Sequence, residues 1–145
     1  MKDKPYVVAL YTRMSKEDDD VGLFGNKEES NSITNQRMLL YDYLNTHPEF
    51  QGYEVMEFCD DGFSGKRMDR PQFNEMMDCV RTGKINCIIV KDFSRFCRDY
   101  IEIGNYLEQL FPFMDIRFIA VTDNYDSKDG GKETAGLEVA FKNFI

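Results

Sequence analysis

The chain has 145 residues, of which 42% are hydrophobic, and these values fit one compact domain around a single core. Its hydrophobic runs are far shorter than the roughly 18 residues that a membrane helix needs. The run near the start is also too short for a secretory signal, so we expect a cytoplasmic protein with no membrane partner. Acidic residues outnumber basic ones by 26 to 18, and the net charge of −8 argues against a domain that binds nucleic acid on its own through phosphate contacts.

In chain order, the first half predicts a strand, a long connection, a helix and a second strand. Residues 7–11 and 54–59 are rich in Val, Ile and aromatic side chains, as buried strands are. The connection over residues 12–31 carries two acidic runs and is unusually long, so it is either functional or disordered. A helix is expected between Ser32 and His47, because the following Pro48 disfavours its continuation. Its apolar face consists of Ile33, Leu40, Tyr41 and Leu44.

The next helix is predicted between Pro71, which suits a first helical turn, and Gly83, which suits a helix end. A strand follows at residues 86–90, where apolar and β-branched side chains dominate. The apolar side chains of this helix recur at helical spacing and are Phe73, Met76, Met77 and Val80.

A third helix is predicted to start at Asp99, which forms a capping-box pattern with Glu102, and to end before Pro112. A fourth strand is expected at residues 116–121. A last apolar stripe is still running where the sequence stops, so we expect the truncated start of a long helix at about residues 134–145. The apolar side chains of the third helix are Ile103, Leu107, Leu110 and Phe111, and those of the last stripe are Leu137, Ala140, Phe141, Phe144 and Ile145.

Strands that alternate with helices indicate an α/β fold. Right-handed crossovers place helices on both faces, which predicts a three-layer αβα domain over residues 1–145 with a mostly parallel sheet of four to five strands. Ligands in such sheets bind beyond the carboxyl ends of the strands. Those ends lead into four loops, where we expect the chemistry: residues 12–15, 60–65, 91–94 and 122–125.

The candidate chemistry rests on a serine and several arginines. The only histidine, His47, lies at a predicted helix end on the side of the sheet opposite these loops, so a Ser-His-Asp triad is not expected. Arg13 and Ser15 are two residues apart after the first strand, so in an extended chain their side chains point to the same side. Arginines can bind a phosphodiester bidentately and stabilise the charge that develops when a hydroxyl attacks phosphorus. Single surface arginines are common, but three more lie in loops of the same sheet edge: Arg70, Arg95 and Arg98.

The four cysteines match no zinc-binding or redox spacing, and the sequence has no second histidine to complete a metal site. We therefore expect reduced, mostly packed thiols and no metal ion. The residues are Cys59, Cys79, Cys87 and Cys97.

Five short motifs in this order resemble the resolvase/invertase, or serine recombinase, catalytic domain. The resemblance runs from about residue 6 through the final helix and is greatest to the large serine recombinases of phages and mobilisable transposons. Each motif alone is weak evidence, whereas five in order are strong evidence. They are residues 11–15 (YTRMS), 32–36 (SITNQ), 61–65 (DGFSG), 69–71 (DRP) and 94–98 (SRFCR).

This resemblance implies a site-specific recombinase or transposase that acts on double-stranded DNA without metal, nucleotide or small-molecule substrate. Ser15 matches the nucleophile, which would form a 5′-phosphoserine link and free a 3′-hydroxyl before the strands rotate and rejoin. Full-length relatives form a homodimer and a synaptic homotetramer through the long helix, and carry a DNA-binding region after it. Matching residues are Arg13, Arg95 and Arg98 for phosphate binding, Arg70 after the acidic Asp69, and Gln36 and Ser64 as supporting polar side chains.

One position departs from the family pattern. Many relatives carry Asp immediately before the first arginine of the last motif, whereas this chain has Ser94 there and Asp92 two residues earlier. Two explanations are open. Either Asp92 handles the proton of the nucleophile from a different angle, or the arginine-rich field alone lowers the pKa of the hydroxyl.

Two other functions are compatible with parts of this sequence. A receiver-type phosphoacceptor domain has a similar sheet, and it would bind magnesium through Asp60, Asp61 and Asp92 with Lys91 nearby. Its first strand should then end in paired carboxylates, whereas this chain has arginine and serine there. The third interpretation keeps the recombinase fold but treats the chain as an interaction module with little cleavage of its own, because its net charge disfavours DNA binding.

Overall fold

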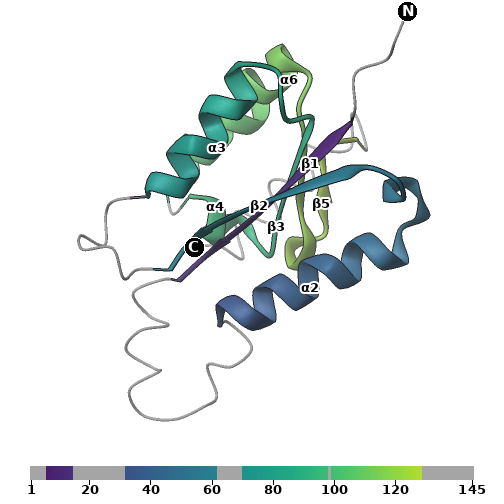
Figure 1. Cartoon of the computed structure of the whole chain (residues 1–145). Coiled ribbons are helices and arrows are strands. Elements are labelled where there is room, and N and C mark those ends of the chain that lie inside the picture. Colours follow the sequence, from purple (N-terminus) through teal and green to yellow (C-terminus); the bar gives the residue numbers. More distant parts are fainter. Residues whose placement is uncertain (1–5, 15–31, 62–69, 98, 129–145) are drawn as a thin grey trace, which may run out of the picture.

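The computed structural model describes residues 6–14, 32–61, 70–97 and 99–128. A five-stranded sheet with strand order β2-β1-β3-β4-β5 forms its centre (Figure 1). The first four strands pair in parallel, and the short β5 runs antiparallel to β4. The strands are β1 (Val7–Arg13), β2 (Glu54–Asp60), β3 (Cys87–Val90), β4 (Arg117–Ala120) and β5 (Tyr125–Asp126). The mostly parallel sheet that the sequence predicts is confirmed, and all four predicted strands are present.

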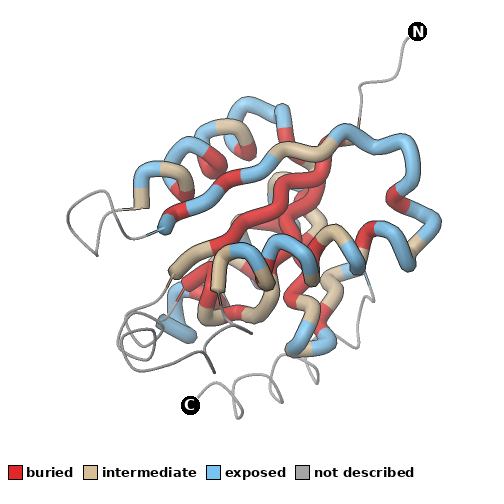
Figure 2. Tube along the Cα trace, turned by 60° about the horizontal axis from the view of Figure 1, so that its bottom comes forward, coloured by how far each residue is buried: buried red, intermediate tan, exposed pale blue. Residues whose placement is uncertain are grey.

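Helices cover both faces of the sheet. Helix α2 (Ile33–Thr46) lies on one face, while α3 (Pro71–Arg81) and the helical segment at residues 100–114 lie on the other (Figure 1). Side chains of β1 alternate between two cores, as strand geometry requires. Tyr11 joins the core under α3, whereas Leu10 joins the core under α2. Figure 2 shows that buried residues fill the central strands, while much of the helix surface is exposed. The three-layer αβα architecture is therefore confirmed.

The predicted helix boundaries follow from their capping residues. The Ser32 side chain accepts a hydrogen bond of 3.1 Å from the backbone N–H of Asn35 and starts α2. Pro71 occupies the first turn of α3, where its missing N–H costs nothing. Gly83 follows the end of α3 with a φ of 81°, a left-handed conformation that glycine adopts without strain.

The helix predicted to end before Pro112 continues through it. Asp99 caps α5 (Tyr100–Asn105) as expected, but a π-helical turn, η3 (Tyr106–Leu110), then leads into α6 (Phe111–Met114). In this turn the N–H of Phe111 bonds to the carbonyl of Tyr106, five residues back. The altered pairing accommodates Pro112, which has no N–H to donate. Asp115 ends the segment with a φ of 59°.

Four short elements lie where the sequence predicts loops or connections. The one-turn helix α4 (Phe93–Phe96) begins in the second half of the predicted loop at 91–94, and η4 (Val121–Asp123) with β5 occupies most of the loop at 122–125. The turn η2 (Pro48–Phe50) joins α2 to β2. Elements of two to four residues are too short to show a hydrophobic period, which is why the pattern did not predict them. Within the described residues, no helix is long and apolar enough to cross a membrane. The helix predicted at 134–145 lies outside the described part of the chain.

Candidate active site at the carboxyl edge of the sheet

The predicted site residues that the structure describes gather at one edge of the sheet. Arg13 is the last residue of β1, and Arg95 lies in α4, which follows β3. Arg70 immediately precedes α3, and Gln36 lies in the first part of α2. The expectation that loops at the carboxyl ends of the strands bring the arginines together is thus met for three of the four arginines. Gln36, which the family resemblance implied, lies beside Arg13. Ser15, Ser64, Asp69 and Arg98 lie outside the described residues.

Arg13 and Arg95 are joined by reciprocal hydrogen bonds. The guanidinium of Arg13 donates through Nε to the carbonyl of Arg95 at 3.0 Å and through Nη2 to the carbonyl of Ser94. In return, Nη1 of Arg95 donates to the carbonyl of Arg13 at 3.0 Å. Arg95 is only 5% exposed, so this link between β1 and α4 is part of the protein interior.

Gln36 fixes the same point of the backbone from the opposite layer. Its side chain is fully buried, accepts from the N–H of Arg13 at 3.2 Å and donates to the carbonyl of Arg13 at 3.0 Å. An amide side chain can satisfy a backbone N–H and a backbone carbonyl at once, because it carries both a donor and an acceptor. Gln36 therefore holds the end of β1 two residues before Ser15.

Arg70 binds the end of α4 as well. Its Nη1 donates to the carbonyl of Phe96, and its guanidinium lies over the ring of Phe73, 3.7 Å from the ring centre. A one-turn helix leaves its last carbonyls without intrahelical partners. In α4 these carbonyls accept hydrogen bonds from Arg13 and Arg70. The short helix is the common attachment point of the arginine cluster, which we define as Arg13, Arg70 and Arg95.

Asp92 has a defined structural task. It is the N-cap of α4, where Oδ1 accepts from the N–H of Arg95 at 3.2 Å and from the hydroxyl of Ser94 at 2.6 Å. The ammonium of Lys91 lies 3.5 Å from its other oxygen. The two residues that depart from the family pattern, Asp92 and Ser94, are therefore hydrogen bonded to each other.

Asp60 is a residue of this edge whose structural role the sequence did not reveal. It is 7% exposed and accepts three hydrogen bonds, from the hydroxyl of Tyr11 at 2.6 Å and from the N–H groups of Gln72 and Phe73 at 3.0 Å each. Asp60 thereby caps α3, whose own N-cap residue makes no side-chain capping bond. The sequence offered one signal for this role. The residue at the N-cap of α3, Arg70, is not a capping type, so the cap had to come from elsewhere in the chain.

These contacts bear on the receiver-type alternative. The oxygens of Asp60 accept from N–H and O–H donors, and Asp92 caps α4. No group of three or more His, Cys, Asp or Glu side chains within the described parts of the chain is placed to hold a metal ion. The geometry therefore does not favour a phosphoacceptor site built on Asp60, Asp61 and Asp92.

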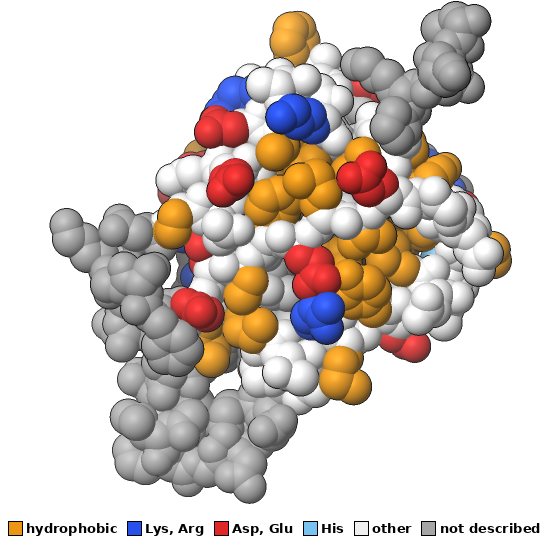
Figure 3. Space-filling view, viewed as in Figure 1, with side chains coloured by type: hydrophobic (Ala, Val, Ile, Leu, Met, Phe, Trp, Pro, Cys, Tyr) orange, Lys and Arg blue, Asp and Glu red, His pale blue; other side chains and the backbone are white. Residues whose placement is uncertain are grey.

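The charge pattern of the surface differs from that of the site. On the face that Figure 1 presents, acidic and basic side chains are interspersed with hydrophobic ones and do not form one basic patch (Figure 3). The arginine cluster is instead held within the fold by backbone carbonyls. Its positive charge is concentrated at the carboxyl edge, where Arg95 is buried and Arg13 and Arg70 are half-buried.

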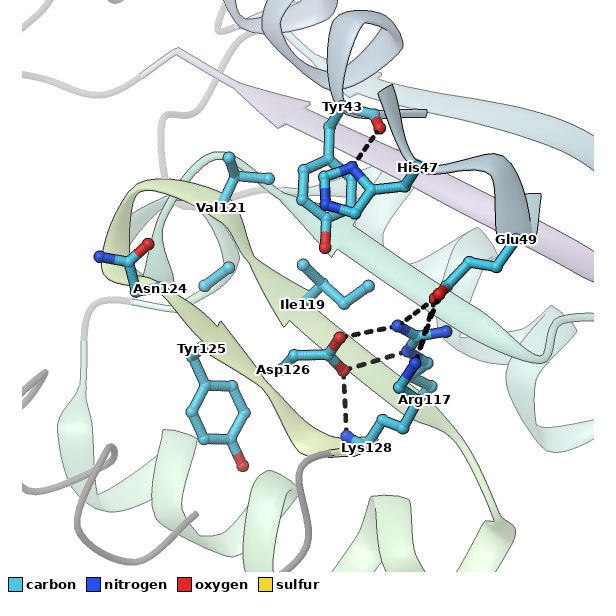
Figure 4. Close-up of a pocket in the computed structure, with 11 residues that line it drawn as sticks. Tyr43, His47, Glu49, Arg117, Ile119, Val121, Asn124, Tyr125, Asp126 and Lys128 are labelled. Carbon is cyan, nitrogen blue, oxygen red and sulfur yellow. Dashed lines mark hydrogen bonds and ion pairs between the residues drawn. The ribbon is translucent and has the colours of Figure 1, made fainter. Parts of the chain in front are cut away.

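The single histidine lies away from this edge, as predicted. His47 is the C-cap of α2, stacks on Tyr43 with ring centres 3.9 Å apart, and makes a 2.8 Å hydrogen bond to the carbonyl of Tyr43 through Nδ1. Stacking on Tyr43 leaves His47 half-buried. It borders a cavity of about 290 Å³ (Figure 4). Arg117 also lines this cavity, where it forms ion pairs with Asp126 at 2.7 Å and with Glu49 at 2.6 Å.

The Arg117 ion pairs predict a pH dependence of stability. Hydrogen bonding to Arg117 lowers the pKa of Glu49. Burial raises the pKa of Asp126, but the hydrogen bonds from Arg117 and from the backbone N–H of Lys128, together with the positive charges of these two residues, outweigh burial and lower it. Groups with lowered pKa values stabilise the fold above their ordinary values of 4.5 and 3.8, and this contribution is lost as the pH falls through the lowered values. Urea unfolding between about pH 6 and about pH 3 should show this loss, and it should be smaller in Arg117→Met. An unchanged pH profile in the variant would contradict the assignment.

All four thiols are free, as the sequence predicts. Burial raises the pKa of Cys87 to about 12 and, together with a hydrogen bond to Glu102, raises the pKa of Cys97 to about 11. Both buried thiols therefore stay protonated near neutral pH. They pack in the two hydrophobic cores.

Comparisons with known proteins agree with this fold. Residues 8–142 match the family model described as resolvase, N-terminal domain. A resolvase family site-specific recombinase from Streptococcus pneumoniae is 27% identical with a TM-score of 0.70, over 95% of this chain and 87% of that one. The N-terminal catalytic domain of TP901-1 integrase is 21% identical with a TM-score of 0.67, over 94% and 92% of the two chains. The catalytic domain of an IS607-like serine recombinase, ISC1926 TnpA, is 20% identical with a TM-score of 0.53, over 94% and 97%. No curated protein matches the chain.

Proposed function

The chain belongs to the resolvase family and forms a serine recombinase catalytic domain, and from this premise we propose that it cuts and rejoins double-stranded DNA through Ser15. The observation that carries the proposal is the arginine cluster around α4. It lies at the end of β1, two residues before Ser15, and it draws its members from three separate segments of the chain.

In the proposed reaction, the hydroxyl of Ser15 attacks the phosphorus of a DNA phosphodiester. A bond forms between the serine oxygen and phosphorus, and the bond from phosphorus to the 3′ oxygen breaks. The serine gives up its proton, and the departing 3′ oxygen gains one. The product is a 5′-phosphoserine link, which keeps the energy of the phosphodiester, so the reverse attack by a 3′-hydroxyl rejoins the strands without ATP.

The arginines supply the stabilisation that this reaction needs. A phosphodiester gains negative charge as the hydroxyl attacks, and fixed guanidinium groups in a poorly hydrated site stabilise that charge strongly. Arg13, Arg70 and Arg95 are held before DNA arrives, so little reorganisation is required. Arg98, which the resemblance adds to this set, lies outside the described residues.

The contacts of Asp92 support one of the two routes for activating Ser15. Asp92 already accepts from Ser94 and from the N–H of Arg95, and these bonds hold its carboxylate in the capping position. We propose that the arginine field lowers the pKa of the Ser15 hydroxyl, while Asp92 and Ser94 shape α4. Gln36 and Ser64 are proposed as supporting polar groups, and Asp69 as the acidic neighbour of Arg70.

Partners follow from the family. We propose that the protein acts on its DNA sites as a homodimer that pairs into a synaptic homotetramer, with residues 134–145 contributing to assembly. A cytoplasmic location fits a DNA substrate and remains a prediction.

The test is covalent capture. The protein is incubated with end-labelled duplex DNA that contains its recombination site, in EDTA and without ATP, and then denatured. We expect a protein–DNA adduct linked to the 5′ end, with a free 3′-hydroxyl that a polymerase can extend. Cleavage that leaves no covalent adduct, or that appears only after magnesium is added, would contradict the proposal.

A further inference from the structure

The connection after β4 holds the start of helix α4, although none of the five family motifs lies in this connection. The backbone N–H and the hydroxyl of Thr122 both donate to the carbonyl of Lys91, at 2.8 and 2.9 Å. The next residue, Asp123, accepts from the backbone N–H of Phe93 at 2.9 Å. These bonds continue the β3–β4 pairing past the strand ends, and the Asp123 carboxylate takes the place of the next backbone acceptor.

The position of this bond matters because α4 is so short. The first N–H groups of any helix have no intrahelical partner. In α4 the first of them, on Phe93, is bound by Asp123, and the N–H of Arg95 is bound by Asp92. Asp92 belongs to the same chain segment as α4 and moves with it. Asp123 is the capping group that ties the start of α4 to a different strand connection.

The charged form of Asp123 is disfavoured at this position. Burial raises its pKa, the hydrogen bond from Phe93 lowers it, and the nearby carboxylate of Asp92 raises it, with a net upward shift. Lys91 is the basic group that faces this pair. An uncharged acceptor of the same shape would avoid the repulsion and keep the hydrogen bond. The hydrogen bond from Phe93 therefore requires a side-chain oxygen at residue 123 but not a negative charge.

The other end of α4 carries the arginine cluster. Arg13 donates to the carbonyls of Ser94 and Arg95, and Arg70 donates to the carbonyl of Phe96. A shift at the first residue of a one-turn helix moves all of these carbonyls, because no further turn separates its two ends. We infer that Asp123 is a positioning residue that sets the arginine cluster for the reaction by anchoring α4. The inference rests on the proposed function.

The experiment compares three variants of the protein on the DNA used for covalent capture. Asp123→Ala removes the acceptor, Asp123→Asn keeps an oxygen acceptor, and Asp126→Ala is the matched control. Asp126 lies three residues away and binds Arg117, not α4. We measure adduct formed per bound protein, each variant at the same interval below its melting temperature. Asp123→Ala should lower the adduct about 100-fold, as a small misplacement of catalytic groups does. Asp123→Asn should stay within about threefold of the parent, since the two side chains cap equally well.

Amide hydrogen exchange at Phe93, Ser94 and Arg95 gives a second readout that needs no DNA. Exchange should speed up at these amides in Asp123→Ala and stay unchanged in Asp126→Ala. The inference is overturned if Asp123→Ala forms as much adduct as Asp126→Ala, or if Asp123→Asn loses as much as Asp123→Ala. If the parent protein forms no adduct at all, the proposed function is contradicted instead. In that case, unchanged amide exchange in Asp123→Ala would contradict the anchoring of α4 by Asp123.

Discussion

Replacing Arg13 by alanine is expected to lower DNA cleavage by roughly 100- to 1,000-fold, with a much smaller loss of site binding. The magnitude is that of removing one preorganised donor that stabilises developing charge. Arg13 holds α4 through the carbonyls of Ser94 and Arg95, so its loss also loosens the contact that Arg95 makes in return. Single-turnover cleavage and site binding are measured separately on the same DNA.

Two further variants sharpen this prediction. Arg13→Lys keeps the charge but lacks the planar fork that binds two carbonyls, so most of the loss should remain. Arg37→Ala removes an arginine whose side chain is 55% exposed and paired with Glu57, and it should leave cleavage unchanged. Equal losses of binding and cleavage in Arg13→Ala would show that Arg13 contributes to DNA affinity and not to the reaction.

Asp60→Ala is expected to destabilise the fold by about 3 kcal/mol. The change removes the cap of α3, which typically contributes about 1 kcal/mol, and leaves the hydroxyl of Tyr11 buried without its acceptor, which costs about 1–3 kcal/mol. Tyr11 is fully buried, and burial together with the bond to Asp60 raises its pKa, so the hydroxyl stays protonated and needs an acceptor. The melting temperature should fall by about 10 °C.

The neighbouring carboxylate provides the control for this change. Asp61→Ala removes an exposed acid one residue away and should leave the melting temperature within about 2 °C of the parent. Adding Tyr11→Phe to Asp60→Ala should recover part of the loss, because the unsatisfied hydroxyl is then gone. If the double variant is no more stable than Asp60→Ala, the buried hydroxyl is not the source of the cost.

The fold could be predicted well from the sequence because its signals are local. Short runs of Val, Ile and aromatic residues indicated β1 to β4, and Ser32 and Pro71 indicated two helix starts. The edge of the sheet at which Arg13, Arg70 and Arg95 meet followed from the rule for parallel strands. Each strand or helix contains several residues that follow the same pattern, so its prediction does not depend on any single residue.

The parts that could not be predicted depend on single side chains. Helix α4 is one turn long and shows no period, yet it holds the arginine cluster. Asp60 caps a helix that begins eleven residues later, and Asp123 caps one that begins thirty residues earlier. Partners so far apart in sequence are brought together by the tertiary fold, and no local pattern indicates them.

The most direct test of the proposed function is to map the residue that carries DNA in the covalent complex. The adduct is digested with protease and nuclease, and the peptide that retains a nucleotide is sequenced by mass spectrometry. We predict that the nucleotide is attached to Ser15 and that Ser15→Ala forms no adduct while still binding the site. A 5′-linked adduct formed by Ser15→Ala, or a nucleotide mapped to any other residue, would contradict the account.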